Sequence, residues 1–246
     1  MSNPTKNELT LGMRFLNAYN ALDKSLRIQY NYKAMISFSD LIRRCADLNQ
    51  VIRTYENDLI TYARLRNAII HSSEMGQVIA EPHLDVVLQM EKIAALINTP
   101  PLVKDIIKMR PVTSIDAQRS MYDLIKETGK TGHSVIPAYR GNHLVGMVRW
   151  RKLIEDLGNS IMDSNDLDEF LKHTTIEEYL RSYPQSGHFT IVNQQVTIEQ
   201  VLTIFNDNRK IATVLITPKG TAMEKPIGIL TNADIMDLFK VIENYK

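Results

Sequence analysis

Apolar side chains recur every three or four positions through most of the first hundred residues, which is the spacing of one face of an α-helix. The clearest run starts with Leu11, Phe15 and Ala18 and continues to Leu26. Similar runs follow downstream, so the pattern predicts four amphipathic helices joined by short turns. Such an arrangement is typical of a helical bundle, which we expect over residues 1–99.

Residues with known capping preferences mark the ends of the later helices. Ser37 is followed three positions later by Asp40, a spacing that predicts a capping box at the start of the second helix. The third helix is expected from Tyr55 to about Gly76, because glycine easily adopts the left-handed conformation of a C-cap. Pro82 starts the fourth, where the missing N–H of proline costs little. The apolar positions expected to face the core are Leu41, Cys45, Leu48, Leu59, Tyr62, Leu65, Ile69, Val86, Met90, Ile93 and Ile97.

A pair of prolines, Pro100–Pro101, ends this helical part, because proline cannot continue a helix and favours a stiff, extended chain. Beyond it, short β-rich runs alternate with single helices. The order strand, helix, strand, strand, helix occurs twice, and we assign the two copies to residues 102–160 and 174–246. Two such units with incomplete sheets are expected to bury their open faces against one another. The strands are predicted at 112–115, 134–139, 143–148, 189–192, 212–217 and 226–230, and the helices at 121–125, 199–205 and 234–242 and in a run ending near Leu157.

Each copy contains the same strand-to-helix corner, Gly146–Leu153 in the first and Gly228–Ile235 in the second. In both, a glycine and two apolar residues end a strand, and an apolar residue opens the following helix. A helix start has unpaired backbone N–H groups and the positive end of the macrodipole, so it attracts phosphate. The second corner adds the carboxylate of Asp234, which can accept hydrogen bonds from two ribose hydroxyls.

These residues resemble a tandem pair of CBS domains, a regulatory unit also called a Bateman module. The resemblance covers about residues 102–246 and is carried by Ser134–Tyr139 with Leu144–Gly146 in the first copy and by Pro226–Ile235 in the second. It implies an α+β fold in which two βαββα repeats, packed as a pseudo-two-fold pair, follow the N-terminal four-helix bundle. It also implies a sensor that binds adenosine-containing ligands in the clefts between the repeats.

Carried over residue by residue, the resemblance assigns Asp234 to the ribose diol and Thr231 to a phosphate. It places Ile211, Ala212 and Thr213 along the adenine. The expected ligand is AMP, ADP, ATP or cyclic di-AMP. Thr231 and Asp234 also have the spacing of a capping box, so a second interpretation is that they only start the helix.

The first copy departs from the family pattern, because Arg149 and Lys152 stand where the threonine and the aspartate are expected. Its own ribose contact is therefore expected to be absent, which leaves one nucleotide site per chain. Cations at a helix start oppose the macrodipole and are locally unfavourable. One interpretation is that Arg149 and Lys152 face the shared cleft and neutralise a polyphosphate. The other is that they form a solvated basic turn.

Within the third predicted helix, the run Arg66–His71 has an arginine, a polar residue, three further residues and a histidine. This pattern, set in a four-helix segment, resembles the signature of the HEPN superfamily. The resemblance implies either a metal-independent endoribonuclease whose site forms at a dimer cleft, or an interaction module without catalysis. In the first case the candidate catalytic residues are Arg66, Asn67 and His71.

Histidine and arginine suit metal-free RNA cleavage, which needs a base for the 2′-hydroxyl and a cation for the charge on the phosphorane. Asn67 and His71 share a helix face, whereas Arg66 lies about 140° from His71 around an ideal helix. Fraying of the helix end or a partner subunit must therefore bring Arg66 and His71 together. The alternative is structural. His71 then caps the helix end, and Arg66 forms an ion pair with Asp58 or Glu74.

Composition narrows the possible partners. The chain has 29 Lys and Arg against 28 Asp and Glu, so no global field attracts nucleic acid or an anionic membrane. The single cysteine, Cys45, forms no internal disulfide, which favours a reducing compartment. No apolar run approaches the roughly 18 residues that span a bilayer, and the histidines show no metal-ligand spacing. We therefore expect a cytoplasmic protein without a metal or a catalytic cofactor.

Together these features predict a cytoplasmic sensor in which the CBS pair binds an adenine nucleotide and regulates the HEPN-like bundle. We expect a homodimer, because CBS pairs commonly associate face to face and a HEPN cleft needs two chains. As an enzyme, the bundle would cleave RNA. As a binding module, it would dimerise or recruit a partner under nucleotide control.

Overall fold

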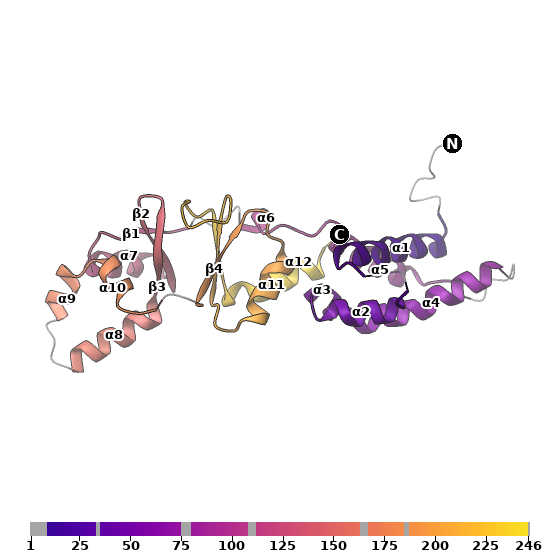
Figure 1. Ribbon diagram of the computed structural model, residues 1–246, viewed down its shortest axis with the longest axis horizontal. Coiled ribbons are helices and arrows are strands. Elements are labelled where there is room, and N and C mark those ends of the chain that lie inside the picture. The colour runs from indigo at the N-terminus through magenta and orange to yellow at the C-terminus, as the bar shows by residue number, and fades with distance from the viewer. Residues whose placement is uncertain are drawn as a thin grey trace. The chain divides into compact units, whose positions relative to one another are not determined.

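The computed structural model is a mixed α+β structure (Figure 1), as expected. The part of the chain that it describes contains two three-stranded sheets. The chain divides into two compact units, of which the first holds Met1–Pro101 with Thr197–Thr203 and Met236–Lys246, and the second holds Leu102–Val196 with Ile204–Ile235. The described residues are 9–32, 35–74, 80–107, 112–162, 167–184 and 187–245.

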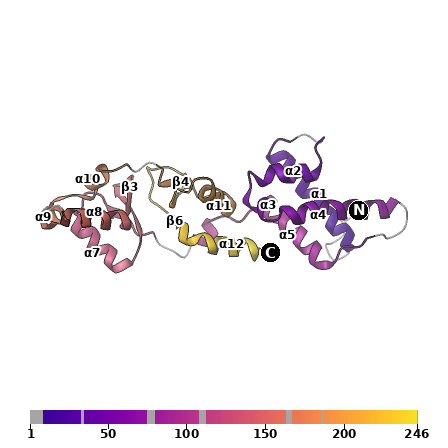
Figure 2. The same cartoon turned by 90° about the horizontal axis from the view of Figure 1, so that it is seen from below.

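The N-terminal part consists of helices (Figure 2), and side chains cap the starts of some of them. The Thr10 hydroxyl accepts a hydrogen bond from the Met13 N–H (3.3 Å), and the Ser37 hydroxyl accepts one from the Asp40 N–H (3.1 Å). Ser37 also donates to the Asp40 carboxylate, which lowers the pKa of Asp40. The predicted helix start at Ser37 is therefore confirmed. The helices are α1 (Leu11–Gln29), α2 (Phe38–Ala46), α3 (Gln50–Thr54), α4 (Glu56–Glu74) and α5 (Leu84–Asn98).

These helices share one apolar core. The ring of Phe15 on α1 meets the ring of Tyr62 on α4 edge to face, with centroids 5.8 Å apart. Cys45 on α2 is fully buried, and burial raises the pKa of its thiol to about 11, so it packs as a small apolar side chain. Other fully buried members of the core are Leu22, Leu26, Leu41, Ile42, Ile52, Leu59, Val87, Met90 and Ile93.

Some details of the helical part differ from the prediction. Leu48 is 53% exposed, because α2 ends at Ala46 and the helical spacing no longer holds beyond it. The short helix α3 was not predicted. On α5, the predicted Met90 and Ile93 are fully buried, whereas Val86 is only half-buried and the unpredicted Val87 is buried. The predicted helix end near Gly76 lies outside the described residues.

The β-rich part repeats one topology, as the sequence predicts. In the first copy the strand order is β1-β2-β3, with β1 parallel to β2 and β2 antiparallel to β3. In the second copy the order is β4-β5-β6, with the same relative directions. The first copy comprises β1 (Ile115–Asp116), α7 (Met121–Thr131), β2 (Val135–Arg140), β3 (His143–Arg149) and α8 (Trp150–Met162), and the second β4 (Phe189–Asn193), α11 (Ile198–Asp207), β5 (Thr213–Thr217), β6 (Gly228–Thr231) and α12 (Ile235–Glu243), with the short helix α6 (Lys104–Ile107) ahead of both.

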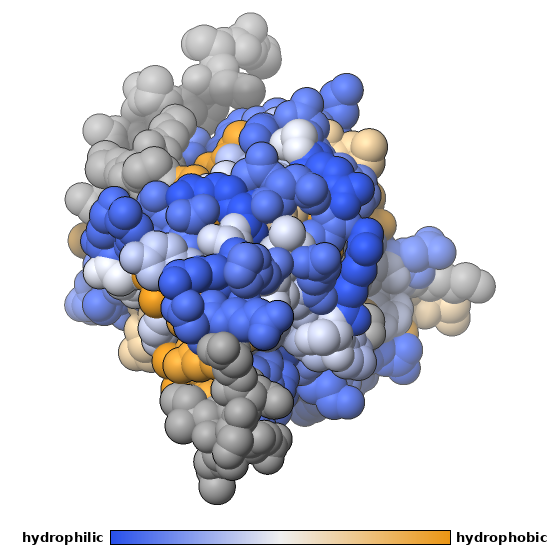
Figure 3. All heavy atoms as spheres, turned by 90° about the vertical axis from the view of Figure 1, so that its left-hand side faces the viewer, coloured by the Kyte–Doolittle hydropathy of each residue, from blue (hydrophilic) through white to orange (hydrophobic). Residues whose placement is uncertain are grey.

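Helices that the sequence did not predict lie between the two copies. At the start of α10 (Ile176–Arg181), the Glu178 carboxylate accepts a hydrogen bond from the Thr175 N–H (2.8 Å), which lowers the pKa of Glu178. Ile176 and Tyr179 of this helix are buried in the core of the first copy, although the sequence assigns 174–246 to the second. Helix α9 has no buried side chain, and Figure 3 shows mainly hydrophilic residues on this end of the first copy. The two helices are α9 (Leu167–His173) and α10 (Ile176–Arg181).

The two copies bury an apolar cluster between their sheets, as expected. Tyr139, Leu144 and Met147 from the first copy are buried against Leu215 from the second. The Leu144 N–H donates a hydrogen bond to the Ala222 carbonyl (2.7 Å), which joins the two copies through their backbones. Burial also raises the pKa of the Tyr139 phenol to about 12. The copies therefore form one packed pair.

The corresponding turns of the two copies differ in how closely the rest of the chain approaches them. Gly141 and Gly220 both have positive φ, +61° and +81°, but only Gly220 is crowded. A Cβ at Gly220 would lie 2.9 Å from the backbone nitrogen of Asn193, whereas one at Gly141 meets nothing within 4 Å. We expect Gly141→Ala to cost about 1–2 kcal/mol of unfolding free energy.

Gly220→Ala should cost at least about 1 kcal/mol more, because the turn or β4 must shift. Urea unfolding followed by circular dichroism measures both variants. Equal losses would contradict the close approach of Gly220 to Asn193.

Candidate functional site

The second strand-to-helix corner brings several predicted residues together. Strand β6 ends at Thr231, a 3₁₀ turn spans Asn232–Asp234, and α12 follows. The Asp234 carboxylate accepts hydrogen bonds from the Thr231 N–H (2.8 Å) and from the Thr231 hydroxyl (3.0 Å). Thr213 lies directly opposite Thr231 in the pairing of β5 with β6. The Thr231 hydroxyl, the Asp234 carboxylate and the start of β5 thus lie at the same end of the sheet.

The segment Ile211–Thr213, which is predicted to line an adenine, leads into β5. The Ile211 N–H donates to the Asn208 carbonyl and the Ala212 N–H to the His188 carbonyl, each at 2.9 Å. Ile211 and Ala212 are half-buried, while Thr213 is buried. The backbone of this segment is therefore held in place just before β5.

The contact between Thr231 and Asp234 matches the second interpretation of these residues, in which they start the helix. A ligand that donates to the Asp234 carboxylate would share an acceptor that Thr231 already uses. Helix capping and ligand binding are compatible here only if the Asp234 carboxylate accepts hydrogen bonds from Thr231 and from the ligand at the same time.

In the first copy, the two predicted basic residues lie against an aromatic ring. The Arg149 guanidinium and the Lys152 ammonium are 5.8 and 5.9 Å from the centroid of the Tyr183 ring. Lys152 also forms an ion pair with Asp156, whose carboxylate accepts a hydrogen bond from the Tyr179 hydroxyl (2.9 Å). The basic turn is thus packed within the first copy, which differs from the solvated turn that the sequence allows.

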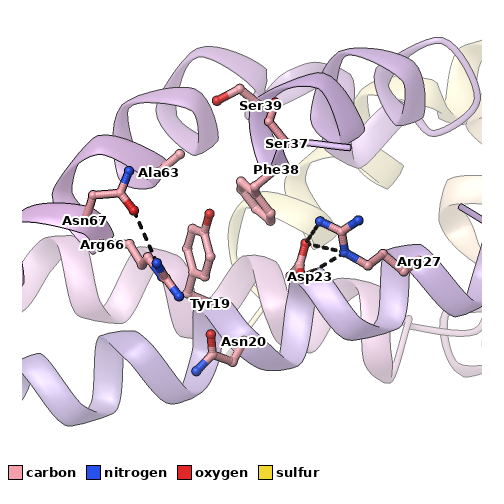
Figure 4. A pocket seen from close by; sticks show the side chains of 10 residues that line it. All are labelled: Tyr19, Asn20, Asp23, Arg27, Ser37, Phe38, Ser39, Ala63, Arg66 and Asn67. Atoms are coloured by element: carbon pink, nitrogen blue, oxygen red, sulfur yellow. Dashed lines mark hydrogen bonds and ion pairs between the residues drawn. The ribbon is translucent and has the colours of Figure 1, made fainter. Parts of the chain in front are cut away.

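In the N-terminal helices, Arg66 and Asn67 line a cavity of about 340 Å³ (Figure 4). The Arg66 guanidinium donates to the Asn67 side-chain oxygen (3.2 Å) and lies 5.9 Å from the centroid of the Tyr19 ring. The alternative ion pair with Asp58 does not form, since the Asp58 carboxylate accepts a hydrogen bond from Gln89 (2.8 Å) and Arg66 makes no ion pair among the described residues. His71 and Glu74 belong to α4, but their side chains lie outside the described part of the chain.

The cavity includes residues that the sequence did not assign to a functional site. Tyr19 and Asn20 come from α1, and Ser37 and Ser39 come from the start of α2. They are far from Arg66 in sequence, and none belongs to the short pattern around it. Only the packing of α1, α2 and α4 brings them together.

Two further properties of the described residues bear on function. No group of three or more His, Cys, Asp or Glu side chains among them is placed to hold a metal ion. Within the same residues, no helix is both long and apolar enough to cross a membrane.

Comparison with solved structures finds CBS-domain proteins. A signal-transduction protein with CBS domains from Burkholderia ambifaria is 17% identical, with 59% of this chain and 96% of that chain covered and a TM-score of 0.43. The CBS domain of a bacterial CNNM/CorC family Mg²⁺ transporter is 20% identical, with 74% and 97% covered and a TM-score of 0.45. The CBS domain of such a transporter in complex with ATP is 18% identical, with 61% and 94% covered and a TM-score of 0.43.

No model of a protein family matches the chain, and no curated protein matches it. Because the structural neighbours described above are at most 20% identical and have TM-scores below 0.5, the ligand and role of this chain must be inferred from its own residues.

The bond between Thr231 and Asp234 predicts a stability effect that does not depend on any ligand. Thr231→Val removes the hydroxyl donor and should cost about 1 kcal/mol of unfolding free energy. Thr190→Val on β4 is the control, because the half-buried Thr190 hydroxyl has no side-chain hydrogen bond among the described residues. Chemical unfolding of both variants tests this, and an equal effect would show that the capping bond contributes nothing.

Proposed function

We propose that the C-terminal part is a CBS pair that binds an adenine nucleotide and regulates the N-terminal helical part. The observation that carries this proposal is the second corner, where Thr231, Asp234 and the start of β5 lie at one edge of the sheet. The repeated topology and the apolar cluster between the copies support it, because a CBS pair needs two such units packed together.

In this proposal, each residue has a chemical role. The Asp234 carboxylate accepts hydrogen bonds from the ribose hydroxyls, and the Thr231 hydroxyl contacts a phosphate. The segment Ile211–Thr213 contacts the adenine through its fixed backbone and its half-buried apolar side chains. AMP, ADP and ATP carry all of these groups, whereas cyclic di-AMP carries the adenine and the phosphate but only one free hydroxyl on each ribose.

One site per chain is proposed, because the first copy lacks the matching carboxylate. Arg149 and Lys152 occupy the corresponding positions, and both contact Tyr183 instead. A polyphosphate that draws either cation into the cleft would first have to separate it from this ring. The first corner is therefore a poorer nucleotide site than the second.

Calorimetry with AMP, ADP, ATP and cyclic di-AMP tests the nucleotide site. At least one nucleotide should bind with one site per chain, and Asp234→Asn should weaken binding by at least about tenfold, since a charge-assisted hydrogen bond contributes about 1.5–3 kcal/mol. Asp237→Asn is the matched control, because Asp237 is exposed on α12 and pairs with Lys240. Absence of heat with every nucleotide would refute the proposal, as would equal affinities of the two variants.

A second candidate function is metal-independent RNA cleavage by the helical part, which the HEPN-like pattern at Arg66, Asn67 and His71 suggests. The observation that favours it is the Arg66 guanidinium, which lines an open cavity without a carboxylate partner among the described residues. Such a cation can stabilise negative charge on a phosphate. The proposed assembly is a homodimer, since a cleft between two subunits can bring Arg66 and His71 together.

Purified protein should cleave single-stranded RNA in the presence of EDTA, and His71→Ala should abolish cleavage. His83→Ala, at the exposed start of α5, should leave cleavage unchanged. If the native chain leaves RNA intact, the enzyme is excluded. A nucleotide-dependent change in molecular mass by light scattering would then support a non-catalytic module that dimerises or recruits a partner.

A further inference from the structure

Two helices of the second copy belong to the same compact unit as the N-terminal helices. This unit contains Thr197–Thr203, which lies mostly in α11, and Met236–Lys246, which includes almost all of α12, together with Met1–Pro101. Helix α12 begins directly after Asp234. One helix therefore runs from the proposed nucleotide site into the unit that holds the helical part.

The end of α12 is held by groups at α5. The Lys92 ammonium on α5 donates a hydrogen bond to the Glu243 carbonyl, and the Tyr245 hydroxyl donates one to the Thr99 carbonyl (2.5 Å) at the end of α5. The last carbonyls of a helix have no partner within the helix and carry the negative end of the macrodipole. Lys92 thus satisfies one of these carbonyls where a cation is favourable.

The short helix α3 is contacted at both ends by side chains from this junction. At its start, the Gln50 N–H donates to the Glu199 carboxylate of α11 (3.2 Å). At its end, the ring of Tyr55 lies 5.8 Å from the Lys92 ammonium, measured to the ring centroid. Lys92 therefore contacts α12 and the end of α3 at the same time.

Helix α12 is suited to transmit a movement along its length. Its nine residues span about 13 Å, and its buried side chains Leu238 and Ile242 are one turn apart on one face. A short helix packed along one face moves as a body, because packed cores are not continuously deformable. A change at the Asp234 carboxylate, which holds Thr231 at the start, would therefore reach the last turn.

We propose that α12 carries the effect of a nucleotide from Asp234 to the helical part, and that Lys92 is the residue of the helical part that senses it. This inference rests on the proposed nucleotide site and adds the route by which that site regulates. Coupling between two sites is reciprocal. If the nucleotide alters the contact of Lys92 with α12, loss of that contact must alter the affinity for the nucleotide.

Calorimetry on the full-length protein tests this reciprocity, with AMP, ADP, ATP and cyclic di-AMP as the probes. Lys92→Met removes the ammonium but keeps an unbranched side chain, and it should change the affinity of a bound nucleotide by at least about fivefold, the lower end of typical couplings. Lys24→Met is the matched control, because Lys24 is exposed on α1, and it should leave the affinity unchanged. Equal affinities of the two variants would overturn the proposal.

A second measurement needs no ligand, so failure of the nucleotide site and failure of this inference are distinguishable. Thr231→Val weakens the start of α12 and should speed hydrogen exchange of the Thr99 amide, at the end of α5, by at least about fivefold in NMR. The Tyr30 amide at the end of α1 should be unchanged, which excludes a general loss of stability. In Lys92→Met protein, Thr231→Val should no longer affect Thr99.

Thr190→Val on β4 is the control for this measurement and should leave the exchange of the Thr99 amide unchanged. An unchanged Thr99 amide in Thr231→Val protein would overturn the proposal, as would equal changes at Thr99 and Tyr30. Either result decides whether α12 transmits, even if calorimetry shows that no nucleotide binds.

Discussion

The packing of two incomplete sheets against each other is the constraint on which the C-terminal part depends. Each sheet has three strands in the described part of the chain, and a sheet of this size is stable only when its apolar face is packed. The apolar cluster of Tyr139, Leu144, Met147 and Leu215 packs a face of one sheet against the other sheet. Because this cluster fixes the two copies relative to each other, it also fixes where the strand-to-helix corners lie.

The second corner couples local structure to the proposed ligand. Asp234 holds the strand end through the N–H and the hydroxyl of Thr231, and the turn that it closes leads straight into α12. In the proposed function, a ribose hydroxyl would share the same carboxylate and so change the environment of the first turn of that helix. The proposed ligand and the geometry at the start of α12 would then be linked through a single side chain.

The strands were predictable from sequence because their signals are local. The run Ser134–Tyr139 is apolar and short, and the structure places β2 at Val135–Arg140. The corner at Gly228–Ile235 was recognisable for the same reason. The capping bond of Asp234 was one of two interpretations, since the sequence spacing alone fits both.

What the sequence could not supply depends on tertiary packing. Leu48 follows helical spacing but lies beyond the end of α2, and helix α10 packs into the first copy although it is close in sequence to the second. The cavity at Arg66 requires side chains from two other helices, and no local pattern connects residues so far apart.

The burial of Cys45 has a practical consequence. The chain has a single cysteine, and its thiol is fully buried with a pKa raised to about 11, so it stays protonated and shielded near neutral pH. A cysteine introduced on the surface would then be the only thiol open to a maleimide. Fluorophores or spin labels can therefore be attached at chosen positions while the native cysteine stays in place.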